Sequence, residues 1–263
     1  LNRLVGTKVS IVTPKVQTTR TRVIGIVTRR EVQILFIDTP GIFLPSQRMQ
    51  RAMVEAAWSG ARQADSVVLL VDANAGLTDA TYGVLAELKE QKRPTIVALN
   101  KVDLVKRTHL LKLASRLNTE GFVTAVFMIS ALTGDGVEDL VTKTAESAPA
   151  GPWLYPEEDV SDVPLRMLAA ELTREKLFLQ LQNELPYSAA IETEEWGERD
   201  DGSVRIDQTI YVQRNSQKLI VIGKNGRRIK SIGTAARFEL EKLLERRVHL
   251  FLHVKVRRDW GER

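Results

Sequence analysis

Short runs of β-branched and aliphatic residues alternate with helical patterns over the first 150 residues of the chain. Residues 22–28, 32–37, 66–72, 95–100 and 124–130 have strand character. Residues 47–63, 78–91, 108–120 and 136–147 repeat apolar residues at helical spacing. This alternation predicts an α/β domain, with a largely parallel sheet covered by helices on both faces. We expect the first two strands to form a hairpin with a turn at Arg29-Arg30.

The pattern changes after residue 147. Residues 148–163 contain three prolines and no sustained period, which predicts an exposed linker. The elements expected beyond it are a helix at 164–184, strands at 188–196 and 204–213, two helices around a glycine loop at 218–246, and a strand at 248–256. The chain therefore divides into a domain at 1–147, a linker at 148–163 and a smaller α+β domain at 164–263.

Charge is concentrated at the C-terminal end. The 263 residues carry a net charge of +5, but residues 214–263 alone hold 14 Lys and Arg against 5 Asp and Glu. A polyanion partner for the second domain and a solvated basic surface both fit this excess. The chain has no cysteine, which excludes a disulfide framework and a thiolate metal site. No apolar run approaches the roughly 20 residues of a membrane-spanning helix.

The strand at 32–37 leads directly into Asp38-Thr39-Pro40-Gly41. Ligand-binding groups of open α/β sheets lie at the carboxyl ends of strands. In a nucleotide hydrolase, an aspartate placed like Asp38 holds Mg²⁺, and the amide of a glycine like Gly41 reaches the terminal phosphate. An ordinary turn is the alternative, because Asp, Pro and Gly all favour turns.

Two further loops follow buried strands. In Asn100-Lys101-Val102-Asp103, the Asp103 carboxylate can accept two hydrogen bonds from guanine, a donor pair that adenine lacks. The Lys101 stem can lie on the base, and Asn100 can tie neighbouring loops together. In Ser130-Ala131-Leu132, the Ala131 amide can donate to the guanine oxygen. Each loop alone is common, but the three in this order predict a guanine-nucleotide site.

With these motifs the sequence resembles the Era family of translation-factor-like GTPases. The resemblance implies a P-loop-type GTPase domain that binds GTP or GDP with Mg²⁺. Gln17-Thr18-Thr19-Arg20 resembles the first switch segment of that family, in which a threonine hydroxyl joins the Mg²⁺ shell. We expect Thr18 and Thr19 at the nucleotide site, with Thr19 rather than Thr18 as the metal ligand beside Asp38.

The sequence departs from that pattern twice. The 263 residues contain no Gly-x-x-x-x-Gly-Lys-[Ser/Thr] phosphate loop, and the opening residues 1–6 resemble the helix that follows this loop in Era proteins. We therefore expect the chain as given to bind nucleotide poorly. Ile42 stands where Ras-like enzymes carry a water-orienting glutamine. No general base is identifiable, and the catalytic residues are unassigned.

The C-terminal domain contains a second recognisable motif at residues 221–230. It resembles the helix–GxxG–helix core of a KH domain, and its element order resembles the type II arrangement. The glycines let the backbone approach a single-stranded RNA, and the basic residues meet phosphates. An isolated GxxG is also a common turn. The candidate RNA-binding residues are Gly223, Lys224, Asn225, Gly226, Arg227, Arg228 and Lys230.

The family resemblance implies a cytoplasmic GTPase that binds the 3′ end of 16S ribosomal RNA and acts in assembly of the 30S subunit. It also implies peripheral association with the inner membrane, and no DNA partner is expected. One alternative is a non-hydrolysing RNA-binding protein whose GTPase-like domain is a scaffold. A second is a membrane-surface protein, but the split of 218–246 at the GxxG loop favours RNA over lipid.

Overall fold

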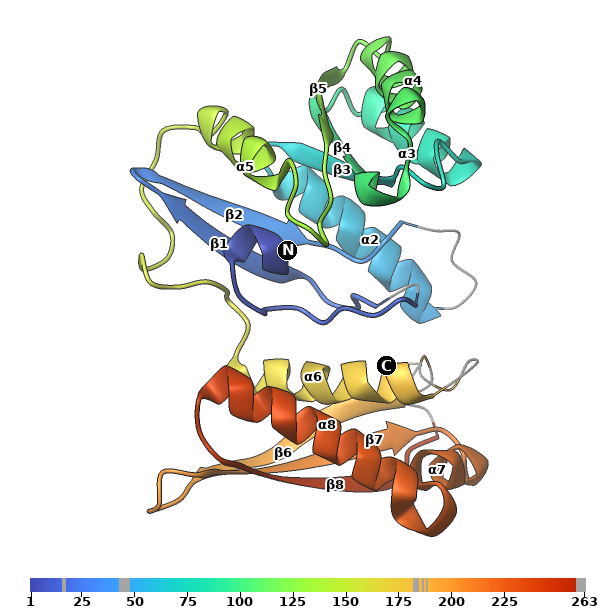
Figure 1. The fold of residues 1–263 in the computed structure, drawn as a ribbon, viewed down its shortest axis with the longest axis vertical. Coiled ribbons are helices and arrows are strands. Elements are labelled where there is room, and N and C mark those ends of the chain that lie inside the picture. Colours follow the sequence, from blue (N-terminus) through green and yellow to red (C-terminus); the bar gives the residue numbers. More distant parts are fainter. Residues whose placement is uncertain (16–17, 43–47, 182–184, 186, 188, 259–263) are drawn as a thin grey trace. The chain divides into compact units, whose positions relative to one another are not determined.

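The computed structural model describes residues 1–15, 18–42, 48–181, 185, 187 and 189–258 (Figure 1). The chain folds into two compact units. Within the described residues, the first unit comprises Leu1–Thr7, Arg20–Ser46 and Arg51–Asp162, and the second comprises Lys8–Thr19, Gln47–Gln50 and Val163–Arg263.

A three-stranded parallel sheet forms the centre of the first unit. Its order is β3 (Val67–Asp72), β4 (Thr95–Asn100) and β5 (Val123–Met128). Val97 and Leu99 of β4 pack toward α3 (Asp79–Glu90) and α4 (Arg107–Asn118). Ile96 and Ala98 pack on the other face, with α5 (Val137–Glu146). The expected α/β sheet with helices on both faces is confirmed.

An antiparallel hairpin of β1 (Val23–Arg29) and β2 (Val32–Asp38) forms a separate sheet in the same unit. Arg29 pairs with Val32, so the turn residues are Arg30 and Glu31 rather than the expected Arg29-Arg30. Arg30 adopts a left-handed conformation with φ 52°. The apolar face of the hairpin packs against α5 and the short helix α1 (Asn2–Val5). The long helix α2 (Arg48–Gln63) follows β2 in the chain.

The stretch predicted as an exposed linker contacts this hairpin at two places, residues 153–155 and 160–162. The Ile26 amide donates to the Val160 carbonyl at 3.0 Å, and Ser161 forms a bridge with Gly25. The Gln33 side chain accepts hydrogen bonds from the Leu154 and Tyr155 amides at 2.9 and 3.0 Å and donates to the Tyr155 carbonyl at 2.8 Å. Most residues of 148–163 are exposed, as predicted for a linker. Residues 160–162 nevertheless bind to the open edge of β1, a contact that the sequence did not predict.

The second unit is a two-layer α+β fold. Its sheet has the order β6 (Ala189–Glu198), β7 (Val204–Val212) and β8 (Val248–Val256), with β6–β7 antiparallel and β7–β8 parallel. Helices α6 (Leu165–Gln180), α7 (Asn215–Ile222) and α8 (Arg227–Leu244) pack against it through two buried apolar clusters. The helix expected at 164–184 ends at Gln180, and residues 182–184 and Ser188 lie outside the described part of the chain.

Residues Lys8–Thr19 belong to this second unit, although the sequence placed them in a domain at 1–147. Ile11 is buried among Leu168 and Leu172 of α6 and Leu240 of α8. An apolar anchor of this kind explains why the segment packs there, since burying an isoleucine contributes about 1.5–3 kcal/mol.

We predict that Gln33→Ala lowers the free energy of unfolding of the first unit by about 1 kcal/mol, because three hydrogen bonds to residues 154 and 155 are lost. Residues 148–155 should then be cleaved faster in limited proteolysis. Gln63→Ala, an exposed glutamine at the end of α2, is the matched control and should leave the cleavage rate unchanged. Equal rates for Gln33→Ala and wild type would show that these bonds do not hold the segment.

Candidate functional site

The loops after β4 and β5 meet at the carboxyl edge of the parallel sheet. The Asn100 side-chain oxygen accepts a hydrogen bond from the Ala131 amide at 2.9 Å, and the Val102 amide donates to the Ile129 carbonyl at 3.3 Å. Asn100 therefore ties the two loops together. Asp103 follows in a short 3₁₀ turn, η1 (Val102–Leu104), and is exposed to solvent. An exposed carboxylate at this edge is available to a base.

The Ala131 amide is not a free donor in this structure, because it is bonded to Asn100. The sequence predicted that this amide is offered to the guanine oxygen. A bound base would have to share it with the Asn100 side chain. Ser130 is fully buried, and its hydroxyl accepts from the Thr133 amide at 3.1 Å. Ser130 thus holds the loop in shape and does not itself face a ligand.

Two residues that sequence reasoning missed position these loops. Asp72, at the end of β3, forms an ion pair with Lys101 at 2.6 Å and accepts a hydrogen bond from the Asn74 amide at 2.9 Å. Although burial acts in the opposite direction, these hydrogen bonds hold the pKa of Asp72 below its ordinary value. The Arg3 guanidinium donates to the carbonyl of Leu132. Asp72 could have been found as an aspartate that ends a buried strand, whereas Arg3 carries no such signal.

Asp38 ends β2 and Gly41 lies exposed just beyond it. Burial raises the pKa of the Asp38 carboxyl. Its carboxylate accepts no hydrogen bond from any residue that the structure describes. A partly buried carboxylate without a donor among the described residues suits a hard cation, and Mg²⁺ prefers oxygen ligands of this type. In the described ranges no three His, Cys, Asp or Glu side chains gather as a metal cluster.

The GxxG loop links α7 to α8 in the second unit. Gly223 has φ 73°, and a Cβ there would lie 2.7 Å from the Cβ of Arg228. Gly226 has φ 72° and borders open space at the start of α8. Arg228 donates to the Ile220 carbonyl at 2.8 Å and so caps α7 as well as flanking the loop.

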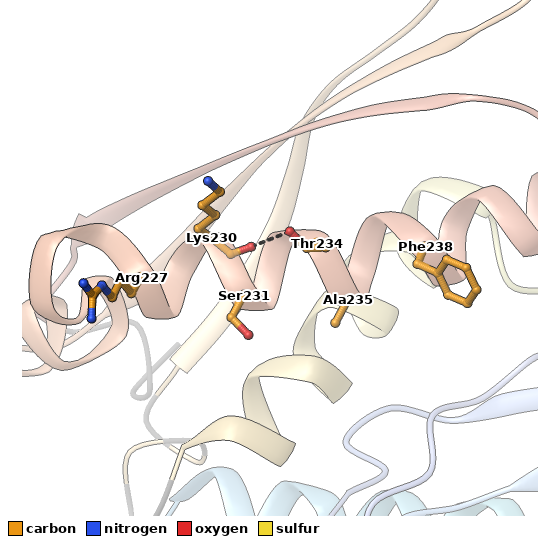
Figure 2. Close-up of a pocket in the computed structure, with 6 residues that line it drawn as sticks. All are labelled: Arg227, Lys230, Ser231, Thr234, Ala235 and Phe238. Carbon is orange, nitrogen blue, oxygen red and sulfur yellow. Dashed lines mark hydrogen bonds between the residues drawn. The ribbon is translucent and has the colours of Figure 1, made fainter.

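The other predicted RNA-binding side chains surround the loop. Asn225 has φ 52°, in the left-handed region that asparagine tolerates. The exposed members of the set are Lys224, Asn225, Arg227, Arg228 and Lys230. Arg227 and Lys230 lie on the first turns of α8 (Figure 2). Together they form a basic rim beside a backbone that a phosphate can approach closely.

Thr18 and Thr19 belong to the second unit, whereas Asp38 belongs to the first. The Thr18 hydroxyl is 2.6 Å from the Thr13 hydroxyl and donates to the Lys15 carbonyl at 2.8 Å. The Thr18 carbonyl accepts from Arg174 of α6 at 2.6 Å. The Thr18 hydroxyl is therefore engaged within its own segment, and Gln17 lies outside the described residues.

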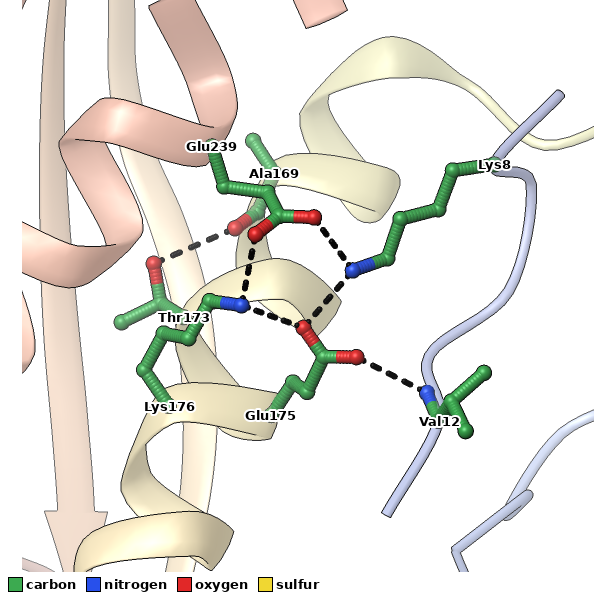
Figure 3. A network of polar contacts seen from close by, with 7 residues as sticks. All are labelled: Lys8, Val12, Ala169, Thr173, Glu175, Lys176 and Glu239. Carbon is green, nitrogen blue, oxygen red and sulfur yellow. Dashed lines mark hydrogen bonds and ion pairs between the residues drawn. The ribbon is translucent and has the colours of Figure 1, made fainter. Parts of the chain in front are cut away.

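Four charged side chains bind this segment to α6 and α8 (Figure 3). Lys8 lies 2.8 Å from Glu175 and 2.5 Å from Glu239, and Lys176 lies 2.8 and 2.7 Å from the same two carboxylates. Glu175 also accepts from the Val12 amide at 2.9 Å, and its side chain is 4% exposed. Burial favours the neutral carboxyl, but the bonds from Lys176, Lys8 and Val12 outweigh it and lower the pKa of Glu175. The alternating charges thus compensate one another within a partly buried network.

Family models match both units. A model described as a 50S ribosome-binding GTPase matches residues 1–101, and a model described as a KH domain matches residues 184–261.

Relatives match the whole chain. GTPase Era of Rhizobium meliloti is 56% identical over 262 residues, which cover 100% of this chain and 84% of that protein. GTPase Era of Brucella suis is 53% identical over 99% of this chain and 84% of its own length. A solved structure of Era with MgGDPNP and nucleotides 1506–1542 of 16S ribosomal RNA has a TM-score of 0.94 and 38% identity. The match covers 100% of this chain and 89% of that chain. A single-residue variant of Aquifex aeolicus Era bound to GDP·AlF4⁻ gives the same TM-score and identity, with 90% of that chain covered.

We predict that Asp103→Asn changes base preference from guanine to xanthine. An amide can donate to the xanthine oxygen that replaces the guanine amine, whereas a carboxylate opposes that oxygen. Competition between GTP and XTP should be measured in a version extended at its N-terminus with a phosphate loop, with the exposed Asp135→Asn as control. An unchanged preference in Asp103→Asn would remove Asp103 from the base site.

We predict that Glu175→Gln lowers the free energy of unfolding of the second unit by about 2 kcal/mol at neutral pH, because two lysines lose a carboxylate. The lowered pKa of Glu175 means that its stabilisation is present above its ordinary value of 4.5 and is lost as the pH falls through the lower folded-state value. In denaturant unfolding between pH 7 and pH 3, the free energy of unfolding should therefore fall more steeply in wild type than in Glu175→Gln. Parallel curves would mean that the network contributes no pH-dependent stability.

Proposed function

Because the chain belongs to the Era family of GTPases, we propose that it binds GTP and GDP with Mg²⁺, hydrolyses GTP, and binds the 3′ end of 16S ribosomal RNA. The observation that carries this proposal is that two features occur in one chain. One is the pair of loops joined by the hydrogen bond between Asn100 and Ala131, and the other is the GxxG loop from Gly223 to Gly226. The complex of Era with MgGDPNP and nucleotides 1506–1542 supports it. The biological role we assign is assembly of the 30S subunit.

In the proposed nucleotide site, Lys101 and Asp103 recognise the base, and Asn100, Ser130 and Ala131 shape its loops. The ion pair between Lys101 Nζ and Asp72 Oδ2, at 2.6 Å, positions the Lys101 side chain for this role. Nucleotide-bound Mg²⁺ neutralises phosphate charge during transfer.

At the phosphate end we assign Asp38 and Thr19 to the Mg²⁺ shell and the Gly41 amide to the terminal phosphate. Thr19 is preferred over Thr18, because the Thr18 hydroxyl is already hydrogen-bonded. The apolar Ile42 side chain cannot orient the attacking water. A group outside the residues named here performs that step.

The segment Lys8–Thr19 supports a link between nucleotide and RNA binding. Its backbone is held on α6 by Glu175 at Val12 and by Arg174 at Thr18. A nucleotide that draws Thr19 into a Mg²⁺ shell acts on the same short segment. We propose that the two sites are coupled through it.

We further propose that the protein works in the cytoplasm on the 30S subunit, with peripheral association at the inner membrane. In the part of the chain that the structure describes, no helix has the length and apolar character needed to cross a bilayer. Flotation with anionic vesicles, with and without a 16S 3′-end RNA competitor, tests the membrane association.

Hydrolysis distinguishes the enzyme from a scaffold. The chain and a version extended with an N-terminal phosphate loop should be assayed for phosphate release from GTP. We expect the extended version to bind GTP at least about tenfold more tightly, a difference of about 1.4 kcal/mol, and to hydrolyse it. A folded extended protein that binds RNA but releases no phosphate would establish the scaffold alternative.

We predict that Gly226→Asp weakens RNA binding by about 2–3 kcal/mol, because a side chain and a negative charge then face phosphate. Lys224→Ala should weaken binding to all sequences alike and reduce the salt slope by about one phosphate contact. The measurement is filter binding of a single-stranded 16S 3′-end oligonucleotide over a salt series, with circular dichroism as the folding control. Wild-type affinity in a folded Gly226→Asp protein would contradict the KH assignment.

A further inference from the structure

One face of α8 forms an open groove that continues away from the GxxG loop. Its lining residues share one side of the helix, at positions i, i+3, i+4, i+7, i+8 and i+11, and are Arg227, Lys230, Ser231, Thr234, Ala235 and Phe238 (Figure 2). The opposite face of the helix is buried through Ile232, Ala236 and Leu240. Burial on that side anchors the helix, so the groove is not needed to form the core.

Phe238 is the unusual member of this groove. It is 70% exposed and therefore accessible to a ligand. It lies 11 positions after Arg227, which is about 16 Å along an α-helix. The groove therefore offers cations at the end nearest the GxxG loop, hydroxyl groups in the middle, and an aromatic ring at the far end.

We propose that this groove is a second RNA contact, in which Arg227 and Lys230 meet phosphates and Phe238 stacks on a base. The inference rests on the proposed RNA-binding function and extends it along α8. A GxxG loop clamps about four nucleotides, whereas the RNA in the solved Era complex comprises nucleotides 1506–1542. RNA that leaves the loop can follow the helix, because exposed cations stand at positions 224, 227, 228 and 230, from the loop to the start of the groove.

RNA fits the groove better than an apolar protein partner does. The groove has one large apolar side chain, Phe238, beside two cations and two hydroxyl-bearing residues. Protein docking sites bury clusters of apolar anchors, while single-stranded RNA sites combine cations with separate aromatic stacking platforms. One ring next to positive charge matches the second arrangement.

The test compares a tetranucleotide, which fills the GxxG loop alone, with an oligonucleotide of about ten nucleotides from the 16S 3′ end. Phe238→Ala should lower the affinity for the longer RNA about tenfold and leave the affinity for the tetranucleotide unchanged. Thr234→Glu should lower the affinity for the longer RNA, and Thr234→Lys should raise it. Neither change should alter the affinity for the tetranucleotide. Phe251→Ala is the matched control, since Phe251 is exposed on β8 at 43% and alternates with residues that pack toward the helices.

The outcomes separate this proposal from the function on which it rests. If wild type binds both RNAs, Gly226→Asp loses both, and the Phe238 and Thr234 variants bind like wild type, the groove proposal is overturned and the KH function stands. The proposal is also overturned if these variants weaken both RNAs equally, because the effect then acts through the GxxG loop. If wild type binds neither RNA, both proposals fail.

Discussion

Burial of β4 between two parallel strands and two helical layers is the constraint on which the candidate nucleotide site depends. Alternate residues of β4 pack on opposite faces, so a shift by one residue would exchange its two apolar faces. The register that results pairs Asp72 with Asn100. Asp72 consequently lies level with the start of the next loop, where its carboxylate reaches Lys101. The ion pair between Asp72 and Lys101 is thus a consequence of packing in the sheet.

The sequence predicted those parts of the structure whose cause is local. β4 and β8 have the bounds expected from their apolar runs, and the other described strands begin and end within two residues of expectation. The loops at residues 100–103 and 130–132 follow β4 and β5 as expected, because parallel strands end at one edge. Contacts between distant residues could not be predicted in this way. Lys8 and Glu175 are 167 positions apart, and Gln33 and Tyr155 are 122 apart. No periodicity or motif pairs one surface charge or amide with another at such a distance.

The segment Lys8–Thr19 is an element whose place in the fold depends on such distant contacts. In sequence it lies between α1 and β1 of the first unit, yet its anchor Ile11 and its ion pairs belong to the second. Loss of the Glu175 carboxylate from this partly buried network is expected to cost about 2 kcal/mol, and allosteric coupling energies are typically about 1–3 kcal/mol. The contacts around Glu175 are therefore strong enough to transmit such a coupling. In the proposed site, a nucleotide that engages Thr19 would act on a segment that the second unit already holds.

The two faces of α8 have different physical tasks, and this separation makes the proposed RNA-binding surface accessible to experiment. Ile232 and Leu240 secure the helix to the sheet and have no contact with solvent. Lys230, Thr234 and Phe238 are exposed and are not among the buried residues of the helix. Changes on the outer face therefore alter charge and stacking at nearly constant stability, since exposed substitutions are usually within about 0.5 kcal/mol. A loss of RNA affinity caused by such a change would report the interface itself, because the fold does not depend on these side chains.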